Sequence, residues 1–326
     1  MTVNVVGRDN RRVESDEGVE MRTLVVGAGA TGGYVGAQLI AGGRDLTFLV
    51  REARRSQLNK HGLQVSTADG ALASTPVRAI TRAELGEEFD IVVVAVRAAA
   101  VDAAMTDSAR AVGDSTMIVP LVNGMNHLDA LVGRFGTRRV CGAAAKLAVS
   151  IRGGVIDEVK PGVDLDMGAL DTADAQAVAA MARELSVPGI ATTVVTDIVS
   201  AMWSKFAFIT STTALTCLLR QRIGPIARAP GGIDFAATIL SEVSRIADSE
   251  GHPLGAPAHE QLQTFLTDPQ SPFAPSMFRD LQDQQPVETE VLGELTQRAR
   301  RHRLEVPLLD AAYLALVVHN NTVAGA

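Results

Sequence analysis

A glycine-rich turn between two apolar runs is the feature of this sequence that most restricts its fold. The stretch "MRTLVVGAGATGGYVGAQLIAGGRDLTFLV", which starts at residue 21, contains a G-x-G-x-x-G motif. The pattern predicts a strand, a tight turn, a helix and a second, parallel strand. In such a turn the backbone can approach a pyrophosphate closely, and the helix N-terminus attracts its charge. This context favours dinucleotide binding over a plain glycine turn, at Gly27, Gly29, Ala30, Thr31 and Gly32.

The patterning after this unit predicts further strands and then a change to helices. The runs "GLQVST", "FDIVVVAV" and "TMIVPLV" are predicted strands of the same open parallel sheet, which has helices on both faces. The segment "LAVSIRGGVIDEV" predicts a hairpin about Gly153 and Gly154, "DTADAQAVAAMARELS" an amphipathic helix, and "IATTVVT" the last strand. After Asp197 every periodic segment has the helical period.

The length of 326 residues exceeds the usual size of one hydrophobic core, so we expect two domains. The predicted fold class is α/β, with a Rossmann-like dinucleotide-binding domain over residues 21–195 followed by an all-helical domain over residues 196–326. The first 20 residues are polar and acidic, and we expect them to form a disordered leader.

The charge and cysteine content narrow the class of partner. A formal net charge of −7 and a pI near 5.4 argue against binding to nucleic acids or anionic membranes, which needs clustered Lys and Arg. The two cysteines, Cys141 and Cys217, have no metal-ligand spacing and cannot form a disulfide framework. Without a secretory or membrane-spanning segment, the sequence predicts a cytoplasmic protein with a small-molecule partner and no metal site.

The end of the second strand, "TFLVREARR", indicates the cofactor. Enzymes that prefer NAD typically place an acid at this tip, whereas this chain has Arg51, with Arg54 and Arg55 close by. An arginine here could pair with a 2′-phosphate, which favours NADPH; the alternative is a solvated arginine cluster that starts a helix. Arg97 and Asn123 end later strands of the sheet and should also face the cofactor, although Asn123 is equally compatible with a simple Asn-Gly turn.

A lysine in an apolar stretch is the main candidate for proton transfer. Only four of the 30 basic residues are lysines, and Lys205 lies in "AMWSKFAFITSTT" between Trp203 and Phe206. Burial disfavours the charged amine and lowers its pKa towards neutrality, which makes lysine, unlike arginine, a usable proton donor. The alternative is a lysine whose stem packs on Trp203 while its ammonium reaches water.

The segment "PSMFRDLQDQQPVETE" offers partners for this lysine. Ser276 is the predicted N-cap of a short helix, and Pro286 is the predicted first residue of the next helix. Glu288 then falls in the first turn of that helix, where the macrodipole favours a carboxylate. The alternatives are that Ser276 only caps its helix and that Glu288 is one more exposed acid.

These blocks resemble, in order and spacing, the ketopantoate reductases (2-dehydropantoate 2-reductases). The matching residues are "GAGATGG", "LVR", "VNGM" at 122–125, "WSKFAF" at 203–208, and "SMFRDL" followed by "PVETE" at 276–290. The resemblance extends from residue 21 to about residue 318, and the Lys, Ser and Glu blocks are its most specific part. It implies NADPH-dependent reduction of a 2-oxo acid to a 2-hydroxy acid in a cleft between a Rossmann domain and a helical domain. A homodimer is left open.

Carried over by position, the resemblance implies a role for each candidate residue. Lys205 is the expected general acid, and Glu288 is its partner on the substrate side. Asn123 is expected beside the nicotinamide and the substrate. Ser276 is the expected ligand of the substrate carboxylate, and Arg51 that of the 2′-phosphate.

The sequence also departs from the family pattern in ways that affect the substrate. Arg97 replaces the usual lysine and keeps a cation beside the cofactor. Ile209 and Thr213 stand where the family places asparagines that bind the substrate. A substrate hydroxyl left unpaired beside Ile209 would cost ~1–3 kcal/mol. We therefore expect an NADPH-dependent reductase of a 2-oxo acid, with two alternatives: a relative that reduces a less polar ketone, and a non-catalytic NADPH-binding sensor, which would not need Lys205 and Glu288.

Overall fold

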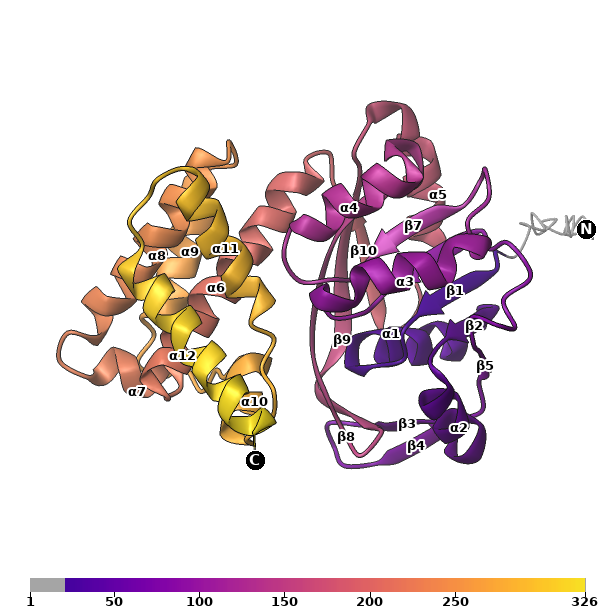
Figure 1. Cartoon of the computed structure of the whole chain (residues 1–326), viewed down its shortest axis with the longest axis horizontal. Helices are drawn as coiled ribbons and strands as arrows, with labels where there is room; N and C mark the ends of the chain where they lie inside the picture. Colours follow the sequence, from indigo (N-terminus) through magenta and orange to yellow (C-terminus); the bar gives the residue numbers. More distant parts are fainter. Residues whose placement is uncertain (1–20, 326) are drawn as a thin grey trace, which may run out of the picture.

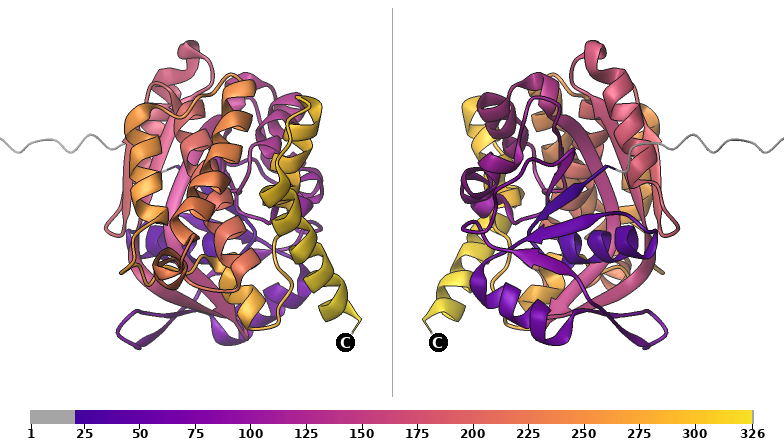
Figure 2. Two further views of the ribbon diagram at one scale, coloured as in Figure 1. Left: turned by 90° about the vertical axis from the view of Figure 1, so that its left-hand side faces the viewer. Right: turned by 90° about the vertical axis from the view of Figure 1, so that its right-hand side faces the viewer.

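The computed structural model describes residues 21–325, so the predicted leader at residues 1–20 lies outside the described residues. The chain forms two lobes that lie side by side (Figure 1). All strands of the described residues belong to the first lobe, which ends with β10 (Ile190–Val194), and the second lobe begins with α6 (Ile198–Leu219). Figure 2 shows the helical lobe from its outer side and the strand-containing lobe from the opposite side. No helix of the described chain combines the length and the apolar character needed to cross a bilayer.

The first lobe is built on a five-stranded parallel sheet in the order β5-β2-β1-β6-β7. The central strands are mostly apolar and are buried along their whole length, because both faces of this sheet are covered. Its strands are β1 (Thr23–Val26), β2 (Leu46–Leu49), β5 (Arg78–Ile80), β6 (Ile91–Val94) and β7 (Met117–Pro120).

Different elements cover the two faces of this sheet. Helices α3 (Val101–Ser108) and α4 (Asn126–Phe135) pack on one face, with Leu24 and Val92 among the buried side chains beneath them. The other face packs on α1 (Ala30–Ala41) and on a second sheet. Helix α2 (Glu52–His61) follows β2 at the edge. Short 3₁₀ turns lie at Ala98–Ala100, Ala109–Ala111, Thr137–Arg139 and Thr172–Asp174.

The second sheet corrects one prediction from the sequence. The run "GLQVST" forms β3 (Leu63–Ser66), which is not part of the parallel sheet; it pairs antiparallel with β4 (Leu72–Thr75) and parallel with β9 (Val155–Ala169). Its burial alternates along the strand, as suits a strand with only one face on the core, whereas the parallel sheet buries both faces. Strand β5 takes the place beside β2 instead.

The predicted hairpin is confirmed as the long pair β8 (Cys141–Arg152) and β9. Gly153 and Gly154 form its turn with φ values of 57° and 89°, a conformation that glycine adopts without strain. The predicted amphipathic helix is α5 (Ala175–Leu185), and the predicted last strand is β10, which pairs with β9.

The second lobe contains helices throughout, as predicted. Helix α6 is buried on most sides because the other helices surround it and its first turn packs on the second sheet, where Ile198 lies directly over Gly142 and Gly168. A Cβ at either glycine would lie 2.5–2.7 Å from Ile198, so α6 is firmly docked on the first lobe. The remaining helices are α7 (Ile223–Arg228), α8 (Gly232–Ser249), α9 (Ala256–Leu266), α10 (Ser276–Gln282), α11 (Glu290–Arg301) and α12 (Pro307–Ala324).

Candidate active site

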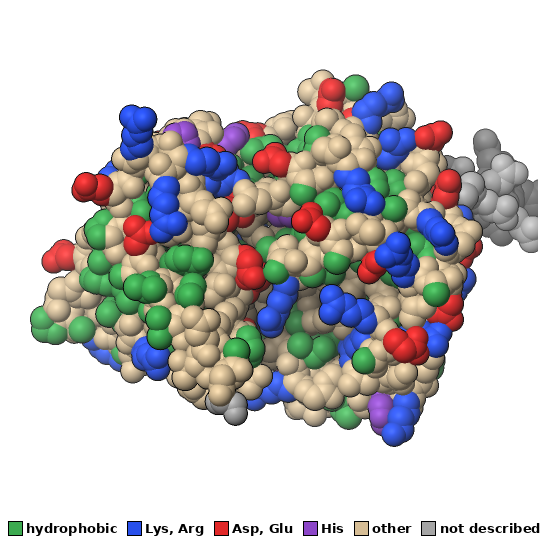
Figure 3. All heavy atoms as spheres, viewed as in Figure 1, with side chains coloured by type: hydrophobic (Ala, Val, Ile, Leu, Met, Phe, Trp, Pro, Cys, Tyr) green, Lys and Arg blue, Asp and Glu red, His purple; other side chains and the backbone are tan. Residues whose placement is uncertain are grey.

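Candidate residues from both lobes meet where α6 runs past the carboxyl end of β7. Charged side chains of both signs gather along the boundary between the lobes (Figure 3). Lys205 on α6 lines a small cavity of about 10 Å³. The other lining residues come from the loop after β7, from β8 and from α6: Val122, Gly124, Ala143, Met202, Phe206 and Ile209. The lysine thus faces the loop that carries Asn123.

The surroundings of Lys205 favour proton transfer. Burial lowers the pKa of Lys205 to about 8, although Glu288 opposes this shift and Lys146 adds to it. The Trp203 ring, two residues before the lysine, is covered by the Arg298 guanidinium at 5.3 Å from its centroid. An amine with this pKa is an ammonium at neutral pH that can release its proton readily.

Glu288 links the two lobes beside this lysine. Its Oε2 accepts a hydrogen bond from Asn123 Nδ2 at 3.2 Å, and its Oε1 accepts one from the backbone N–H of Ala98 at 3.3 Å. The prediction that Glu288 lies in a first helical turn is wrong, because α11 begins at Glu290. The Asn320 side chain holds Val287 by donating to its carbonyl and accepting from its N–H, both at 2.8 Å, and so keeps this segment extended.

Ser276 is close to this segment in sequence but is not an N-cap. It is the first residue of α10, and Pro275 holds the capping position with extended backbone angles. The Ser276 hydroxyl contacts Met277 Sδ at 3.1 Å, and the residue is exposed. Its hydroxyl therefore satisfies no helix N–H group.

The two family asparagine positions on α6 differ in their surroundings. Ile209 lies on the wall of the Lys205 cavity. Thr213 is fully buried, and within the described part of the chain its hydroxyl has no hydrogen-bond partner. Of these two positions only Ile209 thus reaches the cavity wall, where it presents an alkyl side chain.

The glycine turn fits a bound pyrophosphate. Gly27 has φ +100°, and a Cβ there would lie 2.6 Å from the Ala95 carbonyl. A Cβ at Gly32 would lie 2.2 Å from the Gly27 carbonyl, whereas one at Gly29 would meet nothing within 4 Å. Helix α1 starts at Ala30, followed by Thr31, with neither a side-chain cap nor an acid in its first turn. Its first N–H groups are thus left to an anion.

The arginines around this turn differ in their hydrogen-bond and ion-pair partners. Arg54 donates to the carbonyls of Ala28 (3.0 Å) and Gly154 (3.1 Å), and Arg55 pairs with Glu52 and Glu84. Arg51 is exposed just before α2, so it is the arginine at the strand tip best placed for a ligand.

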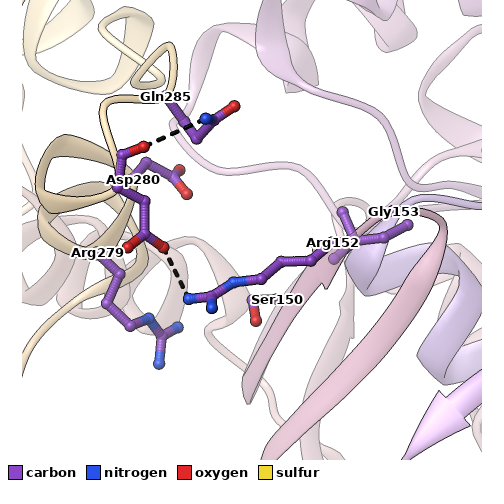
Figure 4. Close-up of a pocket in the computed structure, with 8 residues that line it drawn as sticks. Ser150, Arg152, Gly153, Arg279, Asp280 and Gln285 are labelled. Atoms are coloured by element: carbon purple, nitrogen blue, oxygen red, sulfur yellow. Dashed lines mark hydrogen bonds and ion pairs between the residues drawn. The ribbon is translucent and has the colours of Figure 1, made fainter.

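A larger cavity of about 380 Å³ lies between the β8–β9 hairpin and α10 (Figure 4). Arg152 reaches across it to Asp283 at 2.7 Å and so joins the two lobes. Burial raises the pKa of Asp280 in this cavity, an effect that the positive charge of Arg97 opposes. The Arg97 charge is therefore close enough to Asp280 to act on it.

Three residues near the site were missed by the sequence analysis. His127 is buried, and neither ring nitrogen has a partner within residues 21–325. Burial, together with the charge of Lys205, lowers the pKa of His127 to about 3, so the ring is neutral near physiological pH. Glu294 and Arg298 form a buried ion pair of 2.8 Å on α11. The i,i+4 spacing of Glu294 and Arg298 indicates an ion pair on one helix face, but the same spacing occurs in many exposed pairs and so does not indicate a buried one.

The fold and this cleft define a two-domain dinucleotide-dependent oxidoreductase, with a lysine between the domains. Comparison with known proteins agrees: residues 23–171 match "Ketopantoate reductase PanE/ApbA", and residues 197–319 match "Ketopantoate reductase PanE/ApbA C terminal". The chain belongs to the ketopantoate reductase family.

Relatives cover nearly the whole chain. The "Uncharacterized oxidoreductase YkpB" of Bacillus subtilis is 29% identical over 303 residues, which are 92% of this chain and 99% of the relative. A 2-dehydropantoate 2-reductase of Mesorhizobium japonicum is 29% identical over 322 residues, with coverages of 91% and 97%. A D-mandelate dehydrogenase solved with NADH and anilino(oxo)acetate has a similar fold, with a TM-score of 0.84, 18% identity and coverages of 93% and 99%.

The glycine turn yields a prediction that separates folding from cofactor binding. We expect Gly29→Ala to leave the melting temperature unchanged, because a Cβ there meets no protein atom. It should nevertheless weaken binding of the nicotinamide dinucleotide about tenfold, since the methyl group would displace the pyrophosphate. Isothermal titration calorimetry and thermal unfolding measure the two effects. Gly86→Ala, also at an open glycine, is the control, and unchanged affinity in Gly29→Ala would contradict the assignment.

Proposed function

We propose that this protein reduces a 2-oxo acid to a 2-hydroxy acid with NADPH, and that Lys205 is the general acid. The observation that carries the proposal is the half-buried Lys205, with its pKa lowered to about 8, facing the loop of Asn123 and near Glu288. A non-catalytic NADPH sensor would have no use for this arrangement. The test is the loss of NADPH absorbance in the presence of a panel of 2-oxo acids.

The residues at the carboxyl edge of the parallel sheet would hold the cofactor. The turn from Gly27 to Gly32 and the N-terminus of α1 suit its pyrophosphate, Arg51 a 2′-phosphate, and Arg97 a further phosphate or ribose contact. When bound, NADPH supplies the hydride. Asn123, held by Glu288, would orient the reacting groups beside it.

Lys205 would donate a proton to the carbonyl oxygen of the substrate as negative charge develops there. Glu288 stabilises the ammonium by its charge, and its two hydrogen bonds across the lobes fix its own position. General-acid catalysis of this kind contributes ~10²–10⁴-fold in rate. Ser276, exposed at the start of α10, is the proposed ligand of the substrate carboxylate.

The substrate that this site favours has an apolar side chain. Ile209 presents alkyl surface to the Lys205 cavity, and Thr213 is fully buried. Burial of substrate carbon against such a wall contributes ~25 cal/mol per Å². The similar fold of a D-mandelate dehydrogenase, which was solved with anilino(oxo)acetate, is compatible with this proposal. A cytoplasmic location and a homodimer remain predictions.

The first prediction from this proposal concerns proton transfer. Lys205→Ala should lower kcat by ~10²-fold or more with nearly unchanged NADPH affinity, whereas Lys60→Ala, at an exposed lysine, should not. Reduction needs the ammonium, so kcat/KM should be level below pH ~8 and fall above it; oxidation of the hydroxy acid needs the free amine and should rise up to pH ~8. Near-normal turnover of Lys205→Ala would contradict the role of the lysine.

A second prediction concerns cofactor choice. Wild-type protein should prefer NADPH to NADH, and Arg51→Ala should remove most of this preference, because a charge-assisted phosphate contact is worth ~1.5–3 kcal/mol. Arg55→Ala is the matched control, since Arg55 is already paired with Glu52 and Glu84. Dissociation constants for both cofactors decide the matter, and equal binding of the two by the wild type would refute the assignment.

The third prediction concerns substrate choice. The wild type should reduce an apolar 2-oxo acid faster than ketopantoate, and Ile209→Asn should shift the ratio of kcat/KM towards ketopantoate at least tenfold, about the effect of one hydrogen bond to a substrate group. Ile209→Leu keeps the alkyl surface and serves as control. Efficient use of ketopantoate by the wild type, at ~10⁴ M⁻¹s⁻¹ or above, would count against an apolar substrate.

A further inference from the structure

The loop that carries Asn123 is held by a carboxylate from the other lobe. Both oxygens of Glu294 accept a hydrogen bond from the backbone N–H of Met125 at 3.0 Å, and Oε1 also accepts one from Asn126 N–H at 3.0 Å. These amides lie at the start of α4, where N–H groups lack helical partners. Glu294 thus satisfies them from α11, across the boundary between the lobes.

The fit between this loop and Glu294 is close. Gly124 has φ +93°, and a Cβ there would lie 2.5 Å from Glu294 Oε2. The backbone between Asn123 and α4 therefore rests directly on the carboxylate, which is itself only 7% exposed. A small displacement of Glu294 would move the loop with it, because close-packed atoms transmit such shifts.

A charge network fixes Glu294 in turn. Arg298 donates to Glu294 Oε1 from Nε at 3.0 Å and from Nη2 at 2.8 Å, and Nη2 also donates to Asn126 Oδ1 at 2.9 Å. Its Nη1 pairs with Glu250, at the end of α8, and its guanidinium lies over the Trp203 ring. Burial of these charges is tolerated because each has a partner.

The network ends within two residues of two candidate catalytic residues. Met125 follows Asn123 by two positions, and Trp203 precedes Lys205 by two positions on α6. We propose that Glu294 is a positioning residue: it sets the loop so that the Asn123 side chain reaches Glu288 opposite Lys205. This inference rests on the proposed function for its kinetic consequence, but its structural part stands apart from turnover.

The experiment compares Glu294→Leu and Glu294→Gln with Glu290→Gln, an exposed glutamate one turn earlier on α11. We expect Glu294→Leu to lower kcat at least tenfold while the NADPH dissociation constant changes less than twofold. Glu294→Gln, which keeps one acceptor oxygen, should have a kcat between those of Glu294→Leu and the wild type. The NMR signals of the Asn123 side-chain amide, which donates to Glu288, should shift in both Glu294 variants and stay in place in Glu290→Gln.

These readouts separate the possible failures. If Glu294→Leu does not fold, the isosteric Glu294→Gln still gives both measurements. An unshifted Asn123 amide signal in the Glu294 variants would overturn the proposal. So would a normal kcat in a folded Glu294 variant with a lowered melting temperature, because a residue that only stabilises the fold lowers stability without changing catalysis. If the wild type reduces no 2-oxo acid, the proposed function fails, and the Asn123 signals alone then support or overturn the positioning role.

Discussion

The free-energy cost of withdrawing the half-buried Lys205 ammonium from part of its water is the constraint on which this site depends. An ammonium that loses hydration becomes a stronger acid, and a pKa of about 8 is close to the value that suits proton donation at physiological pH. The charge of Glu288 limits this shift and keeps the amine protonated. Removing either influence would spoil the balance: full hydration would make the lysine too weak an acid, and loss of Glu288 would leave less of it protonated.

Each lobe supplies one side of this site. Helix α6, docked on the second sheet through Ile198, brings the lysine, while the parallel sheet brings the Asn123 loop at its carboxyl edge, where ligands bind in such folds. Polar contacts cross the boundary at three depths: Arg152 with Asp283 at the rim, Glu288 with Asn123 in the cleft, and the buried Glu294 with the start of α4. The buried contact is shielded from solvent and salt, so it can fix the geometry, whereas the rim contact is free to open.

Local signals in the sequence predicted what local interactions determine. The glycine turn, the hairpin at Gly153 and Gly154 and the helices after Asp197 each follow from a few neighbouring residues. The errors arose where distant residues decide. The "GLQVST" strand joined the second sheet because β9, some ninety residues later, is its partner, and Glu288 lies outside a helix because Asn320 holds Val287. Glu294 escaped notice because the amides it binds lie 168 and 169 residues earlier.

The central claim is that this cleft transfers a hydride to a carbonyl carbon while Lys205 supplies the proton. The most direct measurement follows deuterium from NADPH that carries deuterium at both C4 positions of the nicotinamide into the product of a 2-oxo acid, by mass spectrometry and NMR. The account predicts one deuterium at C2 of the 2-hydroxy acid with the wild type, and a rate of label transfer lower by ~10²-fold with Lys205→Ala. NADPH oxidation without deuterium in the hydroxy acid, or equal transfer by the variant, would contradict it.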